Sequence, residues 1–323
     1  MTDGTLRAGI IGSGQIGWRY DGGRWDGTRS VSHAACLDRH PHTRLVALLD
    51  TNAAALNDAA SAIGSHLVTT TDLDRFLDQR LDVICIASPT ASHADHVRAA
   101  AGSGARFVLI EKPVTELRSE FDDLMTFWAT LPEPPRTFVN YFRRGLPQAR
   151  LLRDACRGSG LVALDFNYSR GLAVNGVHLI DLCGYLLDLE TMPGLLWVDP
   201  AGGSNPSFAL RAKGVVVSFR GLDLPYHCIE ARATLETGRM SLLEGGLRLE
   251  WEASLPNPAY PGFFRLGAAA PAMDPNLAAR AFLDGTYTSL CALLDETTPS
   301  PSPLGSSAFA QEVLDAVLAR VSP

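Results

Sequence analysis

The stretch Leu6-Arg-Ala-Gly-Ile-Ile-Gly-Ser-Gly-Gln-Ile-Gly17 decides the fold of the N-terminal half. It begins with a short, almost continuously apolar run, which is typical of a strand covered on both faces in a parallel sheet. Glycines then follow in the spacing G-x-G-x-x-G, which permits a tight turn and lets backbone N–H groups approach a pyrophosphate. We therefore predict a dinucleotide-binding loop rather than a ligand-free turn. Its residues are Gly12, Ser13, Gly14, Gln15, Ile16 and Gly17.

Strand and helix patterns alternate through roughly the first 130 residues. Three further strands are expected where apolar residues follow one another almost without interruption, at 44–50, 82–87 and 105–110. Helices are expected at 53–63, 73–78, 93–101 and 116–131. Strands that alternate with helices in this way predict a doubly wound parallel sheet.

The pattern changes after the prolines at 132–135 and a strand at 137–142. Further strands are expected at 162–168, 215–219, 229–235, 239–243 and 247–251, and helices at 175–187, 277–294 and 308–321. The pair Gly245-Gly246 is a hairpin signal, so this half is expected to contain a large, mostly antiparallel sheet. We therefore expect an α/β protein with two domains, 1–120 and 121–323, whose last helices are free to pack back on the first domain.

The composition excludes several classes of protein. The 323 residues fit two domains, and a hydrophobic content of 46% with 20% charged residues excludes a wholly disordered chain. The formal charge of −7 argues against a nucleic-acid-binding protein. No apolar run approaches the roughly 18 residues of a membrane span, and the N-terminus lacks a signal-peptide pattern, so we expect a cytoplasmic protein. No Cys/His spacing is typical of a zinc site, so no metal is expected.

Asp50 ends the second predicted strand and bears on the choice of dinucleotide. A carboxylate at this position would accept hydrogen bonds from both hydroxyls of an adenosine ribose and would repel a 2′-phosphate. The next residues, Thr51 and Asn52, supply no arginine to compensate. Asp50 therefore favours NAD over NADP. The alternative is that it only caps the helix that begins near Ala53.

The spacing between Gly17 and Asp50 is unusually long. It is 33 positions, whereas an acidic residue usually follows this glycine motif by about 20 residues. The surplus indicates an insertion near 18–30, which is rich in Trp, Arg and Gly. Because it follows the first strand, the insertion is expected near the ligand, where Trp25 would contact the substrate. The alternative is a solvated loop with one tryptophan held in the core.

The composition of basic residues points to Lys112. The chain has 26 arginines and only two lysines, Lys112 and Lys213, so a retained lysine suggests a need for amine chemistry. Lys112 follows the fourth strand and is expected at the ligand edge of the sheet, where it could transfer the proton that accompanies hydride transfer. A surface salt bridge with Glu111 is the alternative. Small residues after the third strand, from Ala87 onward, would leave room for a nicotinamide.

Several of these features together resemble the glucose–fructose oxidoreductase/inositol dehydrogenase (Gfo/Idh/MocA) family. The matching features run to about residue 187, and the rest matches only in general layout. They are Gly12–Gly17, Asp50, Ser88-Pro89-Thr90 with His93, Glu111-Lys112-Pro113, Asn140-Tyr-Phe-Arg-Arg144 and Asn175-Gly-Val-His178-Leu-Ile-Asp181. The resemblance implies a Rossmann domain, with Ser88, Pro89, His93, Glu111 and Lys112 also at the cofactor, and a second α/β domain whose open sheet serves substrate binding and oligomerisation.

The resemblance also implies an NAD(P)-linked oxidoreductase acting on sugars, cyclitols or their derivatives. It gives Lys112 a catalytic or substrate-positioning role and places His178 at the reacting hydroxyl or carbonyl. Many members have Asp four residues before that histidine, whereas this chain has Val174, which cannot orient an imidazole. Asn175 offers an amide to the substrate, or else caps the helix. The proton-transfer role therefore falls first on Lys112 and then on His178, with Tyr141 and Tyr168 in reserve.

Arginines bracket the same region. Arg144 and Arg170 are candidates for holding a phosphate or carboxylate through paired hydrogen bonds, as a nucleotide-linked or acidic sugar would require. The alternative for each is an ion pair with Asp165 or Asp181.

Three functions compete. The first is an NAD-dependent dehydrogenase or ketoreductase with a sugar-like substrate, of which imine or enone reduction is a variant. The second is a non-catalytic, dinucleotide-dependent regulator or assembly partner, which Val174 favours and Lys112 opposes. The third is NAD-assisted glycoside cleavage. In each case we expect a homodimer or homotetramer, with no nucleic-acid or membrane partner.

Overall fold

The computed structural model describes residues 5–22, 25, 30–64, 66–158, 160–268 and 285–321. Contacts divide the chain into two compact units. Unit 1 comprises residues 1–142 and 283–307, and unit 2 comprises residues 143–282 and 308–323. The contact boundary therefore lies beyond the domain boundary expected at residue 120, and the chain returns to unit 1 before it ends.

Unit 1 contains a six-stranded parallel sheet in the order β3-β2-β1-β4-β5-β6. Its strands are β1 (Leu6–Ile11), β2 (Thr43–Leu49), β3 (Val68–Thr70), β4 (Val83–Ile86), β5 (Phe107–Ile110) and β6 (Arg136–Val139). This is the order of a doubly wound sheet, in which β2 and β3 are added on one side of β1 and β4 to β6 on the other. The predicted fold class is confirmed, although the short strand β3 was not expected.

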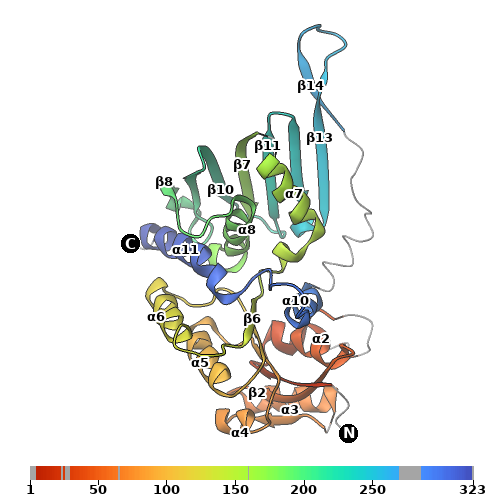
Figure 1. The fold of residues 1–323 in the computed structure, drawn as a ribbon, viewed down its shortest axis with the longest axis vertical. Coiled ribbons are helices and arrows are strands. Elements are labelled where there is room, and N and C mark those ends of the chain that lie inside the picture. Colours follow the sequence, from red (N-terminus) through yellow and green to blue (C-terminus); the bar gives the residue numbers. More distant parts are fainter. Residues whose placement is uncertain are drawn as a thin grey trace. The chain divides into compact units, whose positions relative to one another are not determined.

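In the sequence, helices of unit 1 alternate with these strands, and one further helix joins the unit after the chain has passed through unit 2 (Figure 1). They are α2 (His33–Arg39), α3 (Ala53–Ile63), α4 (Leu73–Leu77), α5 (His93–Gly102), α6 (Arg118–Trp128) and the returning helix α10 (Gly285–Leu294). The core of the unit joins apolar side chains of α2, α3 and α10 to those of β1, β2, β4 and β5. The described part of the expected helix 277–294 is α10, and residues 277–284 lie outside the described residues.

The expected insertion near residues 18–30 falls in the helical segment that connects β1 to β2. A π-helical turn (η1, Gln15–Arg19) leads into it, one turn of α-helix (α1, Tyr20–Gly22) lies within it, and α2 follows it. Asp21 is fully buried, and its Oδ2 accepts hydrogen bonds from Val31 N at 3.0 Å and from Ser32 N and Oγ at 2.7 Å. A single carboxylate thus closes the base of the insertion and holds the N-terminus of α2 in place.

Unit 2 contains an eight-stranded sheet in the order β14-β13-β12-β11-β7-β10-β9-β8. Its strands are β7 (Leu161–Tyr168), β8 (Gly194–Asp199), β9 (Ser207–Ala212), β10 (Val215–Gly221), β11 (Ile229–Leu235), β12 (Gly238–Leu243), β13 (Arg248–Pro256) and β14 (Phe264–Ala268). Among these strands only β7 and β10 pair in parallel, so the sheet is mostly antiparallel, as predicted. Strands β8, β9 and β14 were not expected.

The described residues of unit 2 include the helices α7 (Pro147–Gly158), α8 (Val177–Leu187) and α11 (Ala308–Val321). Helix α8 contacts both α7 and α11, and α7 also contacts β7, β11 and β12 (Figure 1). A π-helical turn (η4, Leu172–Gly176) leads into α8, so the helix predicted from residue 175 begins with irregular geometry. In the described ranges, every helix is too short or too polar to span a lipid bilayer.

We expect Asp21→Ala to destabilise unit 1 by about 2 kcal/mol or more. The substitution leaves three donors without their carboxylate acceptor, two of them on the buried Ser32, and the loss of a buried acceptor is costly. Denaturant unfolding measures the change, with Asp58→Ala on the exposed face of α3 as the control. An Asp21→Ala variant as stable as the control would contradict the role given to this carboxylate.

Candidate functional site

A cavity of about 450 Å³ opens at the carboxyl ends of the parallel strands in unit 1. Its lining comes from the segments that follow β1, β2, β3 and β4. The lining residues are Ile11, Gly12, Leu49, Asp50, Thr51, Thr71, Leu73, Ser88, Pro89, Ala91, Ser92 and His96. Ligands of open α/β sheets bind at this edge, at the point where the strand order reverses, which here lies beside β1. The predicted cofactor residues Gly12, Asp50, Ser88 and Pro89 therefore line one cavity.

The three glycines of the predicted loop have different roles. Gly12 has a φ of +107°, and a Cβ there would lie 2.5 Å from the carbonyl oxygen of Ala87. A Cβ on Gly17 would overlap the carbonyl oxygen of Gly12. Gly14, by contrast, has no atom within 4 Å of its Cβ position. Packing therefore explains Gly12 and Gly17. The open space at Gly14 fits the close approach of a ligand phosphate to the backbone.

Asp50 holds the glycine loop. Its Oδ2 accepts hydrogen bonds from Ser13 N and Ser13 Oγ, both at 2.6 Å, and its Oδ1 accepts one from Asn52 N at 2.8 Å. Partial burial raises the pKa of Asp50, but these bonds and the charge of Arg19 outweigh burial and bring the pKa below its usual value. Asp50 is therefore a carboxylate at neutral pH.

The cap of the following helix is a different residue. Asn52 Oδ1 accepts hydrogen bonds from Ala54 N and Ala55 N, so Asn52 rather than Asp50 caps α3. The remaining loop residues of the predicted site are placed as follows: Gln15 is exposed, and Ile16 packs against the core of unit 1.

His93 joins two loops of the predicted site rather than facing the cavity. It is buried, with Nε2 2.7 Å from Ser88 O and Nδ1 3.0 Å from Pro113 O. The residue of α5 that does line the cavity is His96, whose Nδ1 lies 2.9 Å from Ser88 Oγ. Sequence reasoning missed His96, since nothing in its neighbourhood distinguishes it from a surface histidine.

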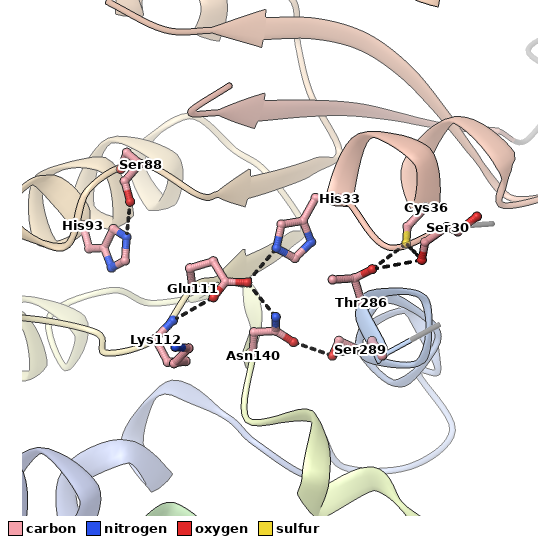
Figure 2. A network of polar contacts seen from close by, with 11 residues as sticks. Ser30, His33, Cys36, Ser88, His93, Glu111, Lys112, Asn140, Thr286 and Ser289 are labelled. Atoms are coloured by element: carbon pink, nitrogen blue, oxygen red, sulfur yellow. Dashed lines mark hydrogen bonds and ion pairs between the residues drawn. The ribbon is translucent and has the colours of Figure 1, made fainter. Parts of the chain in front are cut away.

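Glu111 is the centre of a buried polar network (Figure 2). Its Oε1 accepts a hydrogen bond from Asn140 Nδ2 at 2.6 Å and lies 2.8 Å from His33 Nε2. Ser289 Oγ of α10 donates to Asn140 Oδ1 at 2.6 Å. Burial raises the pKa of Glu111, but His33, Lys112 and Asn140 together lower it to about 2. A permanently charged carboxylate therefore lies directly before Lys112 in the chain.

Lys112 stands beside this network. Glu111 is only 7% exposed, and the charge of Lys112 is one of the causes that lower its pKa. The backbone N–H of Lys112 lies 3.3 Å from Glu111 Oε2, and the lysine side chain is partly exposed. Sequence reasoning missed His33 and Ser289, because they reach the site from segments distant in sequence.

Unit 2 contains the remaining candidates. His178 and Asn175 are both buried, and Asn175 Nδ2 donates to Ser169 O at 2.7 Å. Asn175 lies within η4 and no side chain caps α8, so the capping alternative for Asn175 is not seen. Val174, where many relatives have Asp, is 55% exposed.

The two candidate arginines have different surroundings. Arg144 donates to both carboxylate oxygens of Asp181, at 2.7 and 2.5 Å, and this ion pair is buried. It is the alternative that the sequence left open. Arg170 is exposed and forms no such pair among the described residues. Tyr168 Oη donates to Pro206 O, and burial raises the pKa of Tyr168, so this phenol is engaged and protonated.

Trp25 is partly buried against the core of unit 1, where the guanidinium of Arg39 lies 5.0 Å from its ring centroid. Residues 23–24 and 26–29 of the insertion lie outside the described residues. Within the described ranges, no group of three or more His, Cys, Asp or Glu side chains is arranged to hold a metal ion.

Glu111 gives an expected dependence of stability on pH. Its pKa of about 2 in the folded protein lies below the ordinary 4.5, so its charge stabilises the fold above pH 4.5 and loses this effect as the pH falls toward 2. Glu111→Gln should cost about 3 kcal/mol of unfolding free energy at pH 7 and much less near pH 3. Urea unfolding at several pH values measures the difference, and a difference that does not change with pH would contradict the assignment.

Comparisons with known proteins show that part of this chain is similar to oxidoreductases. A model of the Gfo/Idh/MocA family, described as an oxidoreductase family with an NAD-binding Rossmann fold, matches residues 6–138. The uncharacterized oxidoreductase YrbE of Bacillus subtilis (strain 168) is 31% identical over 218 residues, which is 62% of this chain and 59% of that protein. Inositol 2-dehydrogenase of Rhizobium meliloti (strain 1021) is 30% identical over 110 residues, 34% of this chain and 28% of that protein.

The chain thus matches less than two thirds of the length of either relative. A solved structure extends the likeness of fold to both units. The WlbA dehydrogenase of Bordetella pertussis, in complex with NADH and UDP-GlcNAcA, superposes with a TM-score of 0.72 over 99% of this chain and 96% of that one, at 18% identity. The residues that match the Gfo/Idh/MocA family model, 6–138, are those that form the six-stranded sheet of unit 1, and the similarity to this oxidoreductase family therefore concerns that unit.

Proposed function

We propose that the protein is an NAD(H)-dependent dehydrogenase or ketoreductase acting on a sugar, nucleotide sugar, cyclitol or related alcohol or ketone. The observation that carries this proposal is the cavity at the carboxyl ends of β1 to β4, with Asp50 on its wall and open space at Gly14. The chemistry of two relatives supports the substrate class, since one acts on inositol and another was solved with NADH and a nucleotide sugar.

Asp50 favours NAD over NADP in this proposal. Hydrogen bonds from Ser13 and Asn52 fix the carboxylate in its charged form, and a fixed negative charge repels a 2′-phosphate. Arg19 is the cation whose charge acts on Asp50, and it would favour NADP. Because Asp50 accepts two hydrogen bonds from Ser13 of the glycine loop and one from Asn52, whereas Arg19 is exposed, we assign the preference to Asp50.

Lys112 is the proposed proton donor and acceptor. A bound nicotinamide would supply or accept the hydride at the substrate carbon. The lysine ammonium would give a proton to the oxygen of a ketone during reduction or would take it from a hydroxyl during oxidation. Glu111 holds a negative charge beside it, and the charge of Lys112 in turn helps to lower the pKa of Glu111. In unit 2, Asn175 and His178 would hold the substrate by hydrogen bonds.

The second candidate is a dinucleotide-dependent regulator without turnover, which the apolar Val174 favours. It would bind NADH without consuming it. For either function we propose a homodimer or homotetramer formed through the sheet of unit 2, one face of which is partly exposed along β7, β10 and β11.

Lys112→Met should reduce turnover of a sugar or cyclitol substrate at least 100-fold, because a positioned acid or base contributes about that much or more. The affinity for NADH, measured by calorimetry, should change less than threefold, since the glycine loop and Asp50 remain intact.

The matched control is Lys213→Met, which replaces the other lysine of the chain, an exposed residue in the turn between β9 and β10. It should retain full activity. Near-normal turnover in Lys112→Met would refute the role of this lysine. Tight NADH binding with no oxidation or reduction of any polyol, sugar or ketone by the wild-type protein would favour the regulator.

A further inference from the structure

Two basic residues, Arg170 and His227, follow the point where the ladder between β7 and β11 ends. Tyr168 pairs with Ile229, and the next residues continue the pairing through Ser169 N to Cys228 O at 3.0 Å. Cys228 N in turn donates to Ser169 Oγ at 2.9 Å. The residues one step further along the two segments are Arg170 and His227.

This placement is unfavourable without a ligand. Like charges directly opposite in an antiparallel pair destabilise a sheet, as protonation of His227 beside Arg170 would. Arg170 also has a φ of +67°, a left-handed conformation that costs energy in a residue other than glycine. Asn205 fixes the adjacent turn, because its Oδ1 accepts a hydrogen bond from Gly171 N at 2.7 Å. Strained residues held in this way concentrate at functional sites.

Arg143 adds a third, buried cation. It is 4% exposed, and its Nε donates to Gly245 O at 2.9 Å. Burial lowers the pKa of Arg143 to about 9, while the charge of Asp181 raises it. Burial also lowers the pKa of His227, and the charges of Arg143 and Arg170 lower it further. The charges of Arg143 and Arg170 thus both act on His227.

The nearby acids are engaged elsewhere. Both oxygens of Asp181 accept hydrogen bonds from Arg144, and Glu230 on β11 accepts one from Asn167 at 3.2 Å. In the part of the chain that the structure describes, neither Arg170 nor His227 forms an ion pair with a carboxylate, and the charges that act on His227 are both positive. An oxyanion is the ligand that would balance such a cluster.

We propose that Arg170, His227 and Arg143 form an oxyanion-binding site in unit 2, which takes a carboxylate or phosphoryl group of a small molecule. The site adjoins a proposed substrate residue, because Ser169 O, next to Arg170, accepts the hydrogen bond from Asn175 Nδ2. The oxyanion is therefore a group on the substrate itself, and this last step alone rests on the proposed function. The substrate class narrows to acidic or phosphorylated sugars and cyclitols, including nucleotide sugars.

Calorimetric titrations of the full chain test the site, with and without saturating NADH. The probes are methyl β-D-glucuronide for the carboxylate, inorganic phosphate for the phosphoryl group, and methyl β-D-glucoside as the neutral control. None carries a ketone or free aldehyde, so NADH cannot reduce it. The variants are Arg170→Gln, His227→Gln and, as the matched control, Arg211→Gln, which removes an exposed arginine from β9.

We expect at least one anion to bind ten times more tightly than the neutral glycoside, and Arg170→Gln and His227→Gln each to weaken it about tenfold, whereas Arg211→Gln changes it less than twofold. Equal binding of glucuronide and glucoside, no binding of either anion, or an equal loss in Arg211→Gln would overturn the site. Which anion binds identifies the group. NADH binding without anion binding contradicts this site alone, and anion binding without NADH binding contradicts the proposed function alone.

Discussion

The buried charge of Glu111 is the constraint on which the proposed catalytic region of unit 1 depends. A carboxylate in a protein interior is stable only when other groups compensate it. Here His33, Asn140 and the charge of Lys112 do so, and Ser289 holds Asn140 (Figure 2). His33 and Ser289 belong to α2 and α10, and Asn140 directly follows β6, so one charge connects the segment after the insertion, the edge of the sheet and the returning chain. Lys112 is the next residue in the chain, so the contacts that hold Glu111 also fix the position of the Lys112 backbone.

The glycine loop shows a second division of roles. Gly12 and Gly17 are required by the packing of the loop itself, whereas the space at Gly14 has no such cause within unit 1. Asp50 joins the two functions, because the hydrogen bonds with which it holds Ser13 also keep its charge at the wall of the cavity. The loop is thus ordered before a ligand arrives, which lowers the entropic cost of binding.

The sequence pattern predicted those features of the fold that depend on residues close together in the chain. Apolar runs gave the longer strands of both sheets, and the glycine spacing located the loop, because both depend on neighbours in sequence. The pattern did not reveal the short strand β3, the edge strands β8 and β14, or β9, which lies next to β8. Contacts between distant segments could not be predicted: His33 and Glu111 are 78 positions apart, and Asn140 and Ser289 are 149 apart. Arg144 and Asp181, 37 apart, form an ion pair that the sequence left as one of two alternatives.

The most direct test of the central claim is a calorimetric titration of the wild-type protein and Gly14→Val with NADH and NADPH. The account predicts that the wild-type protein binds NADH more tightly than NADPH. Gly14→Val should weaken NADH binding at least tenfold without lowering the melting temperature, because nothing in the protein lies within 4 Å of the Cβ position and the proposed phosphate would approach the backbone there. Tighter binding of NADPH would show that Asp50 does not set the preference. Binding of neither dinucleotide would contradict the account as a whole.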